Sequence, residues 1–370
     1  MRSALIHDWL VSPVGGGEKC LEAISRLYPS PIYTLVKNSS KLVGTYFEGL
    51  SITSSFLQKM PKVETKYRSY LPLFPKAIER FDLRSFDLVI SSSHCVAKGV
   101  MTHPNQLHIC YCYTPVRYAW DLQEDYLKDS GLHRGIKGAL ARCILRYLRG
   151  WDIRSSKRVD HFIAISHYVA QRIQRFYGRQ AHVIYPPVDL SYYTLEEKKE
   201  NYYVAASRFV PYKKMRLIVE TFSQMPDRQL IVIGDGPEWK KVKEIATANV
   251  KLLGYQPDEV LRGHLQKAKA FIFAAVEDFG ILPIEAMACG TPVIAFGQGA
   301  IRETVLEGET GIFFQEQTAS SLVDGVKKFE RLSFDPKKCR KRAEMFSQER
   351  FNVEFQKFVT EKYEEFFARR

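Results

Sequence analysis

The sequence predicts an α/β fold with two Rossmann-like, doubly wound parallel-sheet domains that face each other across a cleft. Three observations lead to this prediction. Short apolar runs alternate with segments of helical periodicity along both halves of the chain. At 370 residues the chain is too long for one ordinary core, and Pro186 and Pro187 interrupt the alternation near its middle. We therefore expect an N-terminal domain at 1–187, joined by a C-terminal helix at about 347–370, and a second domain at 188–346.

Each half contributes a series of short apolar runs that we interpret as buried strands. These runs lie at 4–6, 86–90, 107–111, 162–165 and 183–185 in the first half, and at 202–205, 230–233, 250–253, 271–273 and 292–295 in the second. A helix is expected at 18–27, and Ser166 stands where it would cap the start of another. Because strands separated by helices form parallel sheets, we expect ligands in the crevice at the carboxyl ends of the strands.

The composition excludes several classes of protein. A hydrophobic content of 45% and an aromatic content of 13% are typical of a soluble globular protein rather than a disordered one. The seven cysteines include no C-x-x-C pair, and their odd number favours a reducing cytoplasm. His7 and Asp8 interrupt the first apolar run, so we expect no signal peptide. The sequence holds no run of about 18 apolar residues that would span a membrane.

The net charge of +13 is concentrated in the first half, where residues 1–190 carry 26 Lys and Arg against 15 Asp and Glu. Two basic segments, 59–84 and 134–158, interleave their charges with aliphatic and aromatic residues, and the second contains Asp152 as its only acid. This pattern favours an anionic membrane surface, and the alternative is a core-facing helix with a solvated basic back. No signature of a nucleic-acid-binding motif is present. We expect a cytoplasmic protein that lies peripherally on the inner face of the plasma membrane.

Two glutamates, Glu277 and Glu285, carry much of the functional signal. Glu277 follows an apolar run at 270–276, and Glu285 opens an expected helix at 285–289, with Gly280 in the turn between them. A strand, a turn and a helix start present free backbone N–H groups to a bound anion. Glu285 would then accept hydrogen bonds from a diol such as a ribose. The alternative is a capped helix with a glutamate in its first turn.

Further motifs fall at the ends of other expected strands. Residues 15–17 are consecutive glycines that would let backbone N–H groups approach a phosphate, although a plain flexible turn has the same composition. Arg208 and Lys213 are spaced to reach one pocket and suit a diphosphate, with a solvated loop as the alternative. Gly234 begins a tight Gly-Asp-Gly-Pro turn, and residues 254–255, Gly-Tyr, end another strand.

In their order and spacing, these motifs resemble the retaining GT-B glycosyltransferases of family 4. The motifs of the second half are Arg208 to Lys213, the turn at 234–237, Glu277 and Glu285, Gly-Thr-Pro-Val at 290–293, and Gly311. In the first half they are Gly-Gly-Gly-Glu at 15–18, Tyr-Cys-Tyr-Thr-Pro at 111–115 and Ala-Ile-Ser at 164–166. Residues 91–94 and 117–121 resemble a mannosyltransferase branch that builds bacterial surface polysaccharides.

The resemblance implies a role for each matched residue. Arg208 and Lys213 would hold the donor diphosphate, Glu285 the ribose, and Glu277 the hydroxyls of the donor sugar. The implied donor-binding set also includes Gly16, Gly17, Gly234, Gly254, Tyr255, Phe279, Gly280 and Ile281. The implied acceptor-side set is Arg117, Tyr118, Trp120 and Asp121. The resemblance further implies that the cleft closes around the donor.

One departure from the family pattern concerns Tyr113, where the family has a histidine that touches the donor sugar. A phenol with an ordinary pKa of about 10 is a poor base at neutral pH. The leaving phosphate can itself take the acceptor proton in a retaining reaction, so Tyr113 stays among the candidate catalytic residues with Glu277, Lys213 and Arg208. Histidines at 94, 103, 108 and 167 remain nearby candidates, although a structural role is favoured over a catalytic one for each. No metal motif is recognised, so we expect neither a metal nor a cofactor.

The function that follows is transfer of a hexose, mannose from GDP-mannose, to a lipid-linked or oligosaccharide acceptor in surface polysaccharide synthesis. Three alternatives stay open: a UDP-sugar-dependent transferase of the same fold, an epimerase or phosphorylase, and a non-catalytic protein that binds nucleotide sugars or membranes. The intact acidic and basic motif residues argue for an enzyme, whereas Tyr113 argues for the non-catalytic alternative. A phosphorylase would need a pyridoxal lysine, which the sequence does not identify.

Overall fold

The computed structural model describes residues 1–11, 15–121, 123–129, 131–132 and 134–368. The chain divides into two compact units, which we describe separately. The first unit comprises Met1–Pro187 together with Phe351–Arg370, and the second comprises Val188–Arg350.

The first unit is built on a seven-stranded parallel sheet of order β3-β2-β1-β4-β5-β6-β7. Its strands are β1 (Ser3–His7), β2 (Ile32–Thr34), β3 (Ile52–Ser54), β4 (Leu88–Ser93), β5 (Leu107–Cys112), β6 (His161–Ala164) and β7 (Ala181–Val183). The chain begins in the middle of the sheet and winds outward in both directions, so the topological switch lies between β1 and β4. Side chains at this switch point converge at the carboxyl ends of these two strands.

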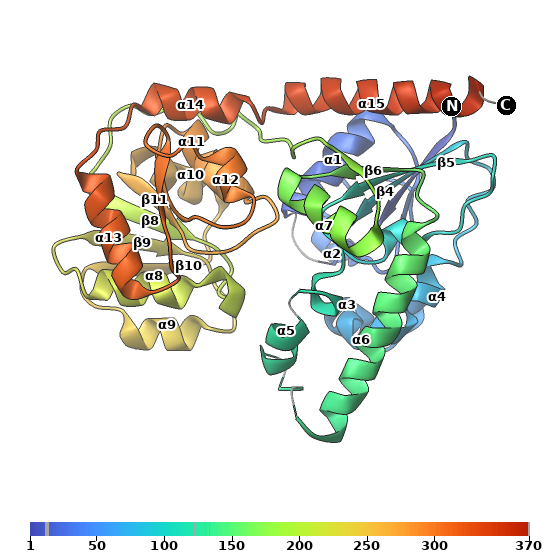
Figure 1. Cartoon of the computed structure of the whole chain (residues 1–370), viewed down its shortest axis with the longest axis horizontal. Helices are drawn as coiled ribbons and strands as arrows, with labels where there is room; N and C mark the ends of the chain where they lie inside the picture. Colours follow the sequence, from blue (N-terminus) through green and yellow to red (C-terminus); the bar gives the residue numbers. More distant parts are fainter. Residues whose placement is uncertain (12–14, 122, 130, 133, 369–370) are drawn as a thin grey trace. The chain divides into compact units, whose positions relative to one another are not determined.

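Helices of very different length connect these strands (Figure 1). They are α1 (Gly16–Leu27), α2 (Ser39–Leu42), α3 (Val63–Lys66), α4 (Phe74–Ile78), α5 (Gln123–Asp129), α6 (Gly135–Ser156), α7 (His167–Tyr177) and α15 (Gln348–Ala368), with 3-10 turns η1 (Phe56–Lys59), η2 (Tyr67–Leu73), η3 (Ala97–Gly99) and η4 (Arg117–Ala119). The hydroxyl of Ser166 accepts a hydrogen bond from the Val169 amide at the start of α7, which confirms the expected cap. In α15, Phe351 and Phe355 pack edge-on against Tyr111 of β5.

The second unit has a six-stranded parallel sheet of order β10-β9-β8-β11-β12-β13. Its strands are β8 (Tyr202–Ala206), β9 (Gln229–Ile233), β10 (Val250–Gly254), β11 (Ala270–Phe273), β12 (Val293–Phe296) and β13 (Gly311–Phe314). The strands are almost continuously apolar because both faces of the sheet are covered, with α8 and α9 on one side and α10 and α11 on the other (Figure 1). The switch point of this sheet lies between β8 and β11.

The helices of the second unit confirm the predicted α/β alternation but correct one boundary. They are α8 (Met215–Ser223), α9 (Trp239–Ile245), α10 (Asp258–Lys267), α11 (Ile281–Ala288), α12 (Ile301–Thr304), α13 (Ala319–Glu330) and α14 (Pro336–Glu344), with a 3-10 turn η5 (Pro211–Lys213). The expectation that Glu285 opens a helix is wrong. The helix begins at Ile281, because Gly280 adopts a left-handed φ of 81° and Pro283 fits the first turn. Glu285 lies in the second turn.

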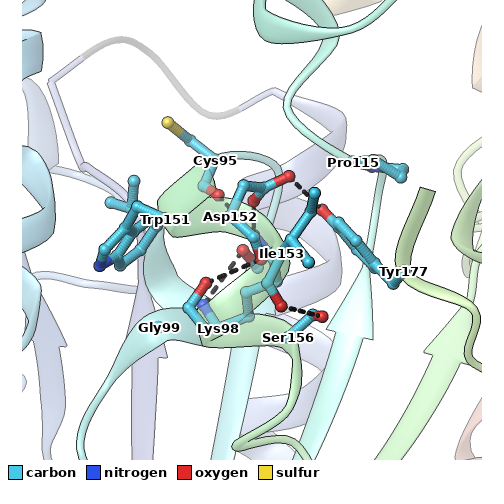
Figure 2. Close-up of polar contacts among 12 residues, drawn as sticks. Cys95, Lys98, Gly99, Pro115, Trp151, Asp152, Ile153, Ser156 and Tyr177 are labelled. Atoms are coloured by element: carbon cyan, nitrogen blue, oxygen red, sulfur yellow. Dashed lines mark hydrogen bonds and ion pairs between the residues drawn. The ribbon is translucent and has the colours of Figure 1, made fainter. Parts of the chain in front are cut away.

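A buried ion pair anchors α6 to the first unit (Figure 2). Asp152 of α6 has no exposed surface, and its carboxylate binds the ammonium group of Lys98 from η3. The other carboxylate oxygen accepts hydrogen bonds of 2.8 Å from Trp120 Nε1 and from the Tyr177 hydroxyl. Burial opposes the charge on Lys98, but the adjacent Asp152 carboxylate outweighs it and raises the pKa of Lys98. The only acid in the basic segment 134–158 is therefore neutralised inside the fold.

Candidate active site

The structure brings Lys213 and Glu277 together at the carboxyl ends of the strands of the second unit. The ammonium group of Lys213, at the end of η5, donates to Glu277 Oε1, and the two side chains are 21% and 18% exposed. Glu277 is held by its backbone, which bridges to Gly299 and accepts a hydrogen bond of 3.1 Å from the Ala300 amide. A Cβ at Gly299 would lie 2.7 Å from the Glu277 carbonyl oxygen, so this close approach requires glycine. A fixed carboxylate and a partly exposed ammonium group thus lie in contact at this edge of the sheet.

Arg208 lies near the same edge, because the loop after β8 packs tightly on the turn after β9. The Phe209 amide donates to the Asp235 carbonyl at 2.8 Å. A Cβ at Gly234 would lie 1.9 Å from the Ser207 carbonyl oxygen, so the glycine permits the loop to approach. Arg208 is exposed. The structure therefore gives Gly234 a role in packing, and its contact with a donor stays a prediction.

The first turn of α11 presents backbone N–H groups next to this edge. Phe279 precedes the helix and is buried against Phe346, while Gly280 and Ile281 begin the helix. Glu285 is buried with 6% exposed surface. Burial and then the adjacent Glu285 carboxylate raise the pKa of Tyr193 far above its ordinary value, which places that phenol beside the glutamate.

Gly254 and Tyr255 end β10. The Gly254 carbonyl accepts a hydrogen bond of 2.8 Å from the Gly234 amide, and Gly254 has a left-handed φ of 70°. Tyr255 is 73% exposed, and its contact with a donor stays a prediction.

In the first unit, the glycines at 15–17 form the start of α1, but a carboxylate already occupies that start. Gly15 is the N-cap, and Glu18 Oε2 accepts a hydrogen bond of 3.0 Å from the Gly15 amide. Gly16 and Gly17 are the first two residues of the helix. A phosphate at this position would face the negative charge of Glu18 as well as the helix N-terminus. The approach of Gly16 and Gly17 to a diphosphate stays a prediction.

The hydroxyl group of Tyr113 makes hydrogen bonds within the first unit. It donates to the Gly17 carbonyl oxygen at 2.9 Å and lies 2.8 Å from the Ser92 hydroxyl. Burial, followed by the nearby Cys20 and Tyr111, raises the pKa of Tyr113 well above its ordinary value. The phenol is therefore neutral and already hydrogen-bonded, which suits a residue that positions α1. Its catalytic role stays a prediction.

The acceptor-side residues lie in and directly after η4, and contacts within the unit hold them there. The Tyr118 hydroxyl lies 2.6 Å from Cys95 Sγ, and Asp121 forms an ion pair of 2.9 Å with Arg172 Nε. Trp120 donates to buried Asp152 and stacks on Phe176 with ring centroids 4.5 Å apart. Arg117 opens the turn. Contact of these residues with an acceptor stays a prediction.

Sequence reasoning overlooked one constellation of the first unit, Asp8 with His94. Asp8 directly follows β1 and His94 directly follows β4, so both stand at the topological switch point. His94 Nδ1 lies 3.2 Å from Asp8 Oδ2. In the sequence, each of these polar residues directly follows an apolar run, which could have marked them as candidates. The spacing along the chain did not indicate that β1 and β4 are neighbours in the sheet.

Two structural features are absent from the described part of the chain. Those residues include no group of three or more His, Cys, Asp or Glu side chains arranged to hold a metal ion. None of the helices in the same residues combines the length and the apolar composition needed to cross a bilayer.

Comparison with known protein families identifies the family to which the chain belongs. Residues 47–192 match the family described as Glycosyltransferase Family 4, and residues 193–346 match the family described as Glycosyl transferases group 1. The chain belongs to glycosyltransferase family 4 and has the GT-B fold, which confirms the resemblance read from the motifs.

The chain is similar to several curated proteins over part of their length. It is 26% identical over 172 residues to an uncharacterized glycosyltransferase of Methanocaldococcus jannaschii, covering 45% of this chain and 48% of the relative. It is 32% identical over 125 residues to the GDP-mannose-dependent alpha-(1-6)-phosphatidylinositol monomannoside mannosyltransferase of Mycolicibacterium smegmatis, covering 29% and 33%. It is 25% identical over 193 residues to the O-antigen chain mannosyltransferase RfbU of Salmonella typhimurium, covering 48% and 53%. The match therefore spans about half or less of these relatives.

Solved structures resemble the chain over almost its full length. HepE of Anabaena in complex with UDP gives a TM-score of 0.69 at 16% identity, covering 98% of this chain and 100% of that structure. The sucrose-phosphate synthase of Thermosynechococcus elongatus gives 0.71 at 17% identity, covering 98% and 99%. These likenesses confirm the predicted fold class.

Proposed function

We propose that the chain is a retaining glycosyltransferase that moves a hexose from a nucleotide diphosphate sugar to a saccharide acceptor. The observation that carries this proposal is the Lys213–Glu277 pair at the carboxyl edge of the second sheet, with exposed Arg208 on the neighbouring loop. An ammonium and a guanidinium group suit the two phosphates of a donor, because charge develops on the diphosphate as it leaves. The adjacent carboxylate suits sugar hydroxyls, which donate hydrogen bonds to it.

In the proposed reaction, the bond between the anomeric carbon and the diphosphate oxygen breaks. A bond forms between that carbon and an acceptor hydroxyl oxygen, and the acceptor proton leaves with the phosphate. Lys213 and Arg208 stabilise the departing charge, whereas Glu277 orients the sugar. Backbone N–H groups at Gly280 and Ile281 supply further donors at the start of α11.

Mannose carried by GDP is the proposed donor. Support comes from two relatives, since the Mycolicibacterium smegmatis protein is named as GDP-mannose-dependent and the Salmonella typhimurium protein as a mannosyltransferase. The competing donor is a UDP-sugar, because HepE is solved with UDP and with UDP-glucose. The proposed acceptor is a lipid-linked saccharide of surface polysaccharide synthesis.

A thermal-shift screen against GDP, UDP and their sugars tests the donor. A ligand held at about 100 times its dissociation constant stabilises the folded state by about 2.7 kcal/mol, enough to move the melting point by degrees. Stabilisation by GDP and GDP-mannose alone supports the mannose proposal. Stabilisation by UDP-sugars alone contradicts it and leaves the reaction class in place. No shift with any nucleotide contradicts the enzyme proposal itself.

The exposed face of α6 supports a peripheral membrane location. Ile136, Leu140, Cys143 and Tyr147 recur at helical spacing along one stripe, and all four are exposed. Ile136 is 89% exposed, although an isoleucine is normally buried. Exposed basic residues flank the stripe, and the segment's only acid, Asp152, is buried and paired with Lys98. An apolar stripe with basic flanks suits the surface of an anionic membrane.

The second basic segment adds to this proposal. Its exposed basic residues are Lys59, Lys62, Lys66, Arg68, Lys76, Arg80 and Arg84. Arg84 forms an ion pair with Asp82 and so contributes less free charge than the lysines. We propose that both segments face the lipid headgroups of the inner leaflet.

A further inference from the structure

The Asp8 side chain is unusually well fixed. It has no exposed surface, and its carboxylate accepts four backbone hydrogen bonds from the segment that follows β4. Oδ2 accepts from the amides of His94 and Cys95 at 2.7 and 3.0 Å, and Oδ1 accepts from the amides of Val96 and Ala97 at 2.6 and 2.8 Å. Charge-assisted bonds of this kind are stronger than neutral ones. The Asp8 carboxylate is therefore held in one position, from which it contacts the side chain of His94.

His94 lies against the Asp8 carboxylate. Its Nδ1 lies 3.2 Å from Asp8 Oδ2, and Trp9 meets its ring edge-on with centroids 4.4 Å apart. A carboxylate that accepts the Nδ1 proton leaves the other ring nitrogen, Nε2, as a hydrogen-bond acceptor. In the described part of the chain Nε2 has no hydrogen-bond partner, and the side chain is 31% exposed. The imidazole is thus oriented from one side and open on the other.

Two neighbouring polar side chains, Tyr113 and His7, do not offer a ligand an exposed hydrogen-bond acceptor. Tyr113, whose ring centroid lies 6.3 Å from that of His94, uses its hydroxyl on Gly17 and Ser92. His7 is fully buried, and its Nδ1 lies 3.0 Å from the Ser92 hydroxyl. His7 Nε2 also lacks a partner in the described residues, but the ring has no exposed surface through which a substrate could reach it. At this sheet edge a ligand therefore meets the His94 nitrogen.

We propose that His94 contacts the substrate, with Nε2 accepting a hydrogen bond from a saccharide hydroxyl, and that Asp8 is its positioning residue. This inference rests on the proposed glycosyl transfer and names a residue of the first unit that takes part in it. The hydroxyl belongs to the transferred sugar or to the acceptor, since the chemistry of recognition is the same. His94 orients the hydroxyl and takes no proton, because the acceptor proton leaves with the phosphate.

Two substitutions of His94 by an amide residue distinguish the roles of the two ring nitrogens, Nδ1 and Nε2. In His94→Asn the amide reaches about as far as Nδ1, so the contact with Asp8 can persist while the outer acceptor is lost. In His94→Gln the amide reaches about as far as Nε2, so the outer acceptor can persist. We expect His94→Asn to lower kcat/KM about tenfold, the value of one hydrogen bond, and His94→Gln to stay within about threefold of the unchanged protein. The matched control is His103→Asn, at an exposed histidine of the same unit.

Separate measurements distinguish the two sources of the hydroxyl. GDP, GDP-mannose, UDP and UDP-glucose are used as binding probes, and donor hydrolysis is compared with transfer to extracted bacterial lipid-linked saccharides. A contact with the donor sugar makes His94→Asn lose affinity for the nucleotide sugar and keep its affinity for the nucleotide diphosphate. A contact with the acceptor leaves both affinities and donor hydrolysis intact and lowers transfer alone. Either result supports the inference.

Two results overturn it. One is that both amide variants transfer and bind like the unchanged protein. The other is that His94→Asn keeps activity while His94→Gln loses it together with its melting temperature, since this shows that the contact with Asp8 is the whole role. Failure of the proposed function looks different, because the unchanged protein then neither binds nor hydrolyses any nucleotide sugar, and the inference falls with it.

Discussion

The hydroxyl group of Tyr113 donates a 2.9 Å hydrogen bond to the carbonyl oxygen of Gly17, joining the end of β5 to the first turn of α1. We expect Tyr113→Phe to destabilise the protein by about 1–2 kcal/mol, because the Gly17 and Ser92 oxygens lose a buried partner. Activity should fall less than tenfold, since a neutral phenol held by two hydrogen bonds supplies no base. Thermal unfolding and turnover check both expectations. A hundredfold loss of turnover at unchanged stability would show instead that Tyr113 is catalytic.

The Lys98–Asp152 pair predicts a strong and asymmetric effect on stability. Lys98→Met leaves a buried carboxylate without its counter-charge, and losing one partner of such a pair typically costs about 3–5 kcal/mol. The double variant Lys98→Met with Asp152→Leu should unfold at a higher temperature than Lys98→Met alone, because no uncompensated charge remains. The comparison needs the melting temperatures of the unchanged protein, of Lys98→Met, of Asp152→Leu and of the double variant. Additive losses in the double variant would refute the coupling.

Acid should destabilise the first unit through His108. Burial lowers the pKa of His108 to about 4, whereas an unfolded histidine titrates near 6.5. Between these values the unfolded chain binds more protons than the folded one, so stability is lost as the pH falls from about 6.5 to 4, by up to about 3 kcal/mol. His7, whose pKa burial also lowers, acts in the same direction. Unfolding of the unchanged protein and of His108→Asn at pH 7 and pH 5 should show a smaller acid-induced fall in the variant. Equal falls would contradict the assignment.

The α6 surface predicts binding that depends on charge. The double reversal Lys137→Glu with Arg146→Glu should weaken binding to vesicles rich in phosphatidylglycerol at least tenfold, since each basic residue near such a surface contributes about 1 kcal/mol. The matched control reverses Lys327 and Lys341, two exposed lysines of the second unit. Co-sedimentation with vesicles at low and high salt measures both. If the two double variants bind equally well, the α6 face is not the membrane contact.

The central strands of both sheets could be predicted from the sequence because they are continuous buried apolar runs. The prediction missed β2 and β3, which have only three residues each, and β13, where a glycine opens the run. Gly311 is required there, because a Cβ would lie 2.1 Å from the Val293 carbonyl oxygen. The neighbouring strand imposes this requirement for glycine, so it does not appear as a periodic pattern in the local sequence.

For the functional residues too, the sequence indicates which residues matter, whereas the fold determines which of them are in contact. Lys213 and Glu277 were predictable as motif residues, but their contact across 64 positions of sequence comes from the sheet. Asp8 and the His94 amide are 86 positions apart, and they meet because β1 and β4 are adjacent at the switch point. Parallel topology brings distant strand ends together, and nothing in the spacing of the residues encodes which ends meet.

In the proposed mechanism, Lys213 stabilises the departing nucleotide diphosphate. The most direct measurement is the rate of nucleotide diphosphate release from GDP-mannose and from UDP-glucose, in the presence of extracted lipid-linked saccharides, by the unchanged protein, Lys213→Ala and the exposed control Lys240→Ala. We expect release by the unchanged protein and by Lys240→Ala, and a fall of at least a hundredfold in Lys213→Ala at a nearly unchanged melting temperature. Release by Lys213→Ala at the rate of the control, or no release by the unchanged protein with either donor, would contradict the account.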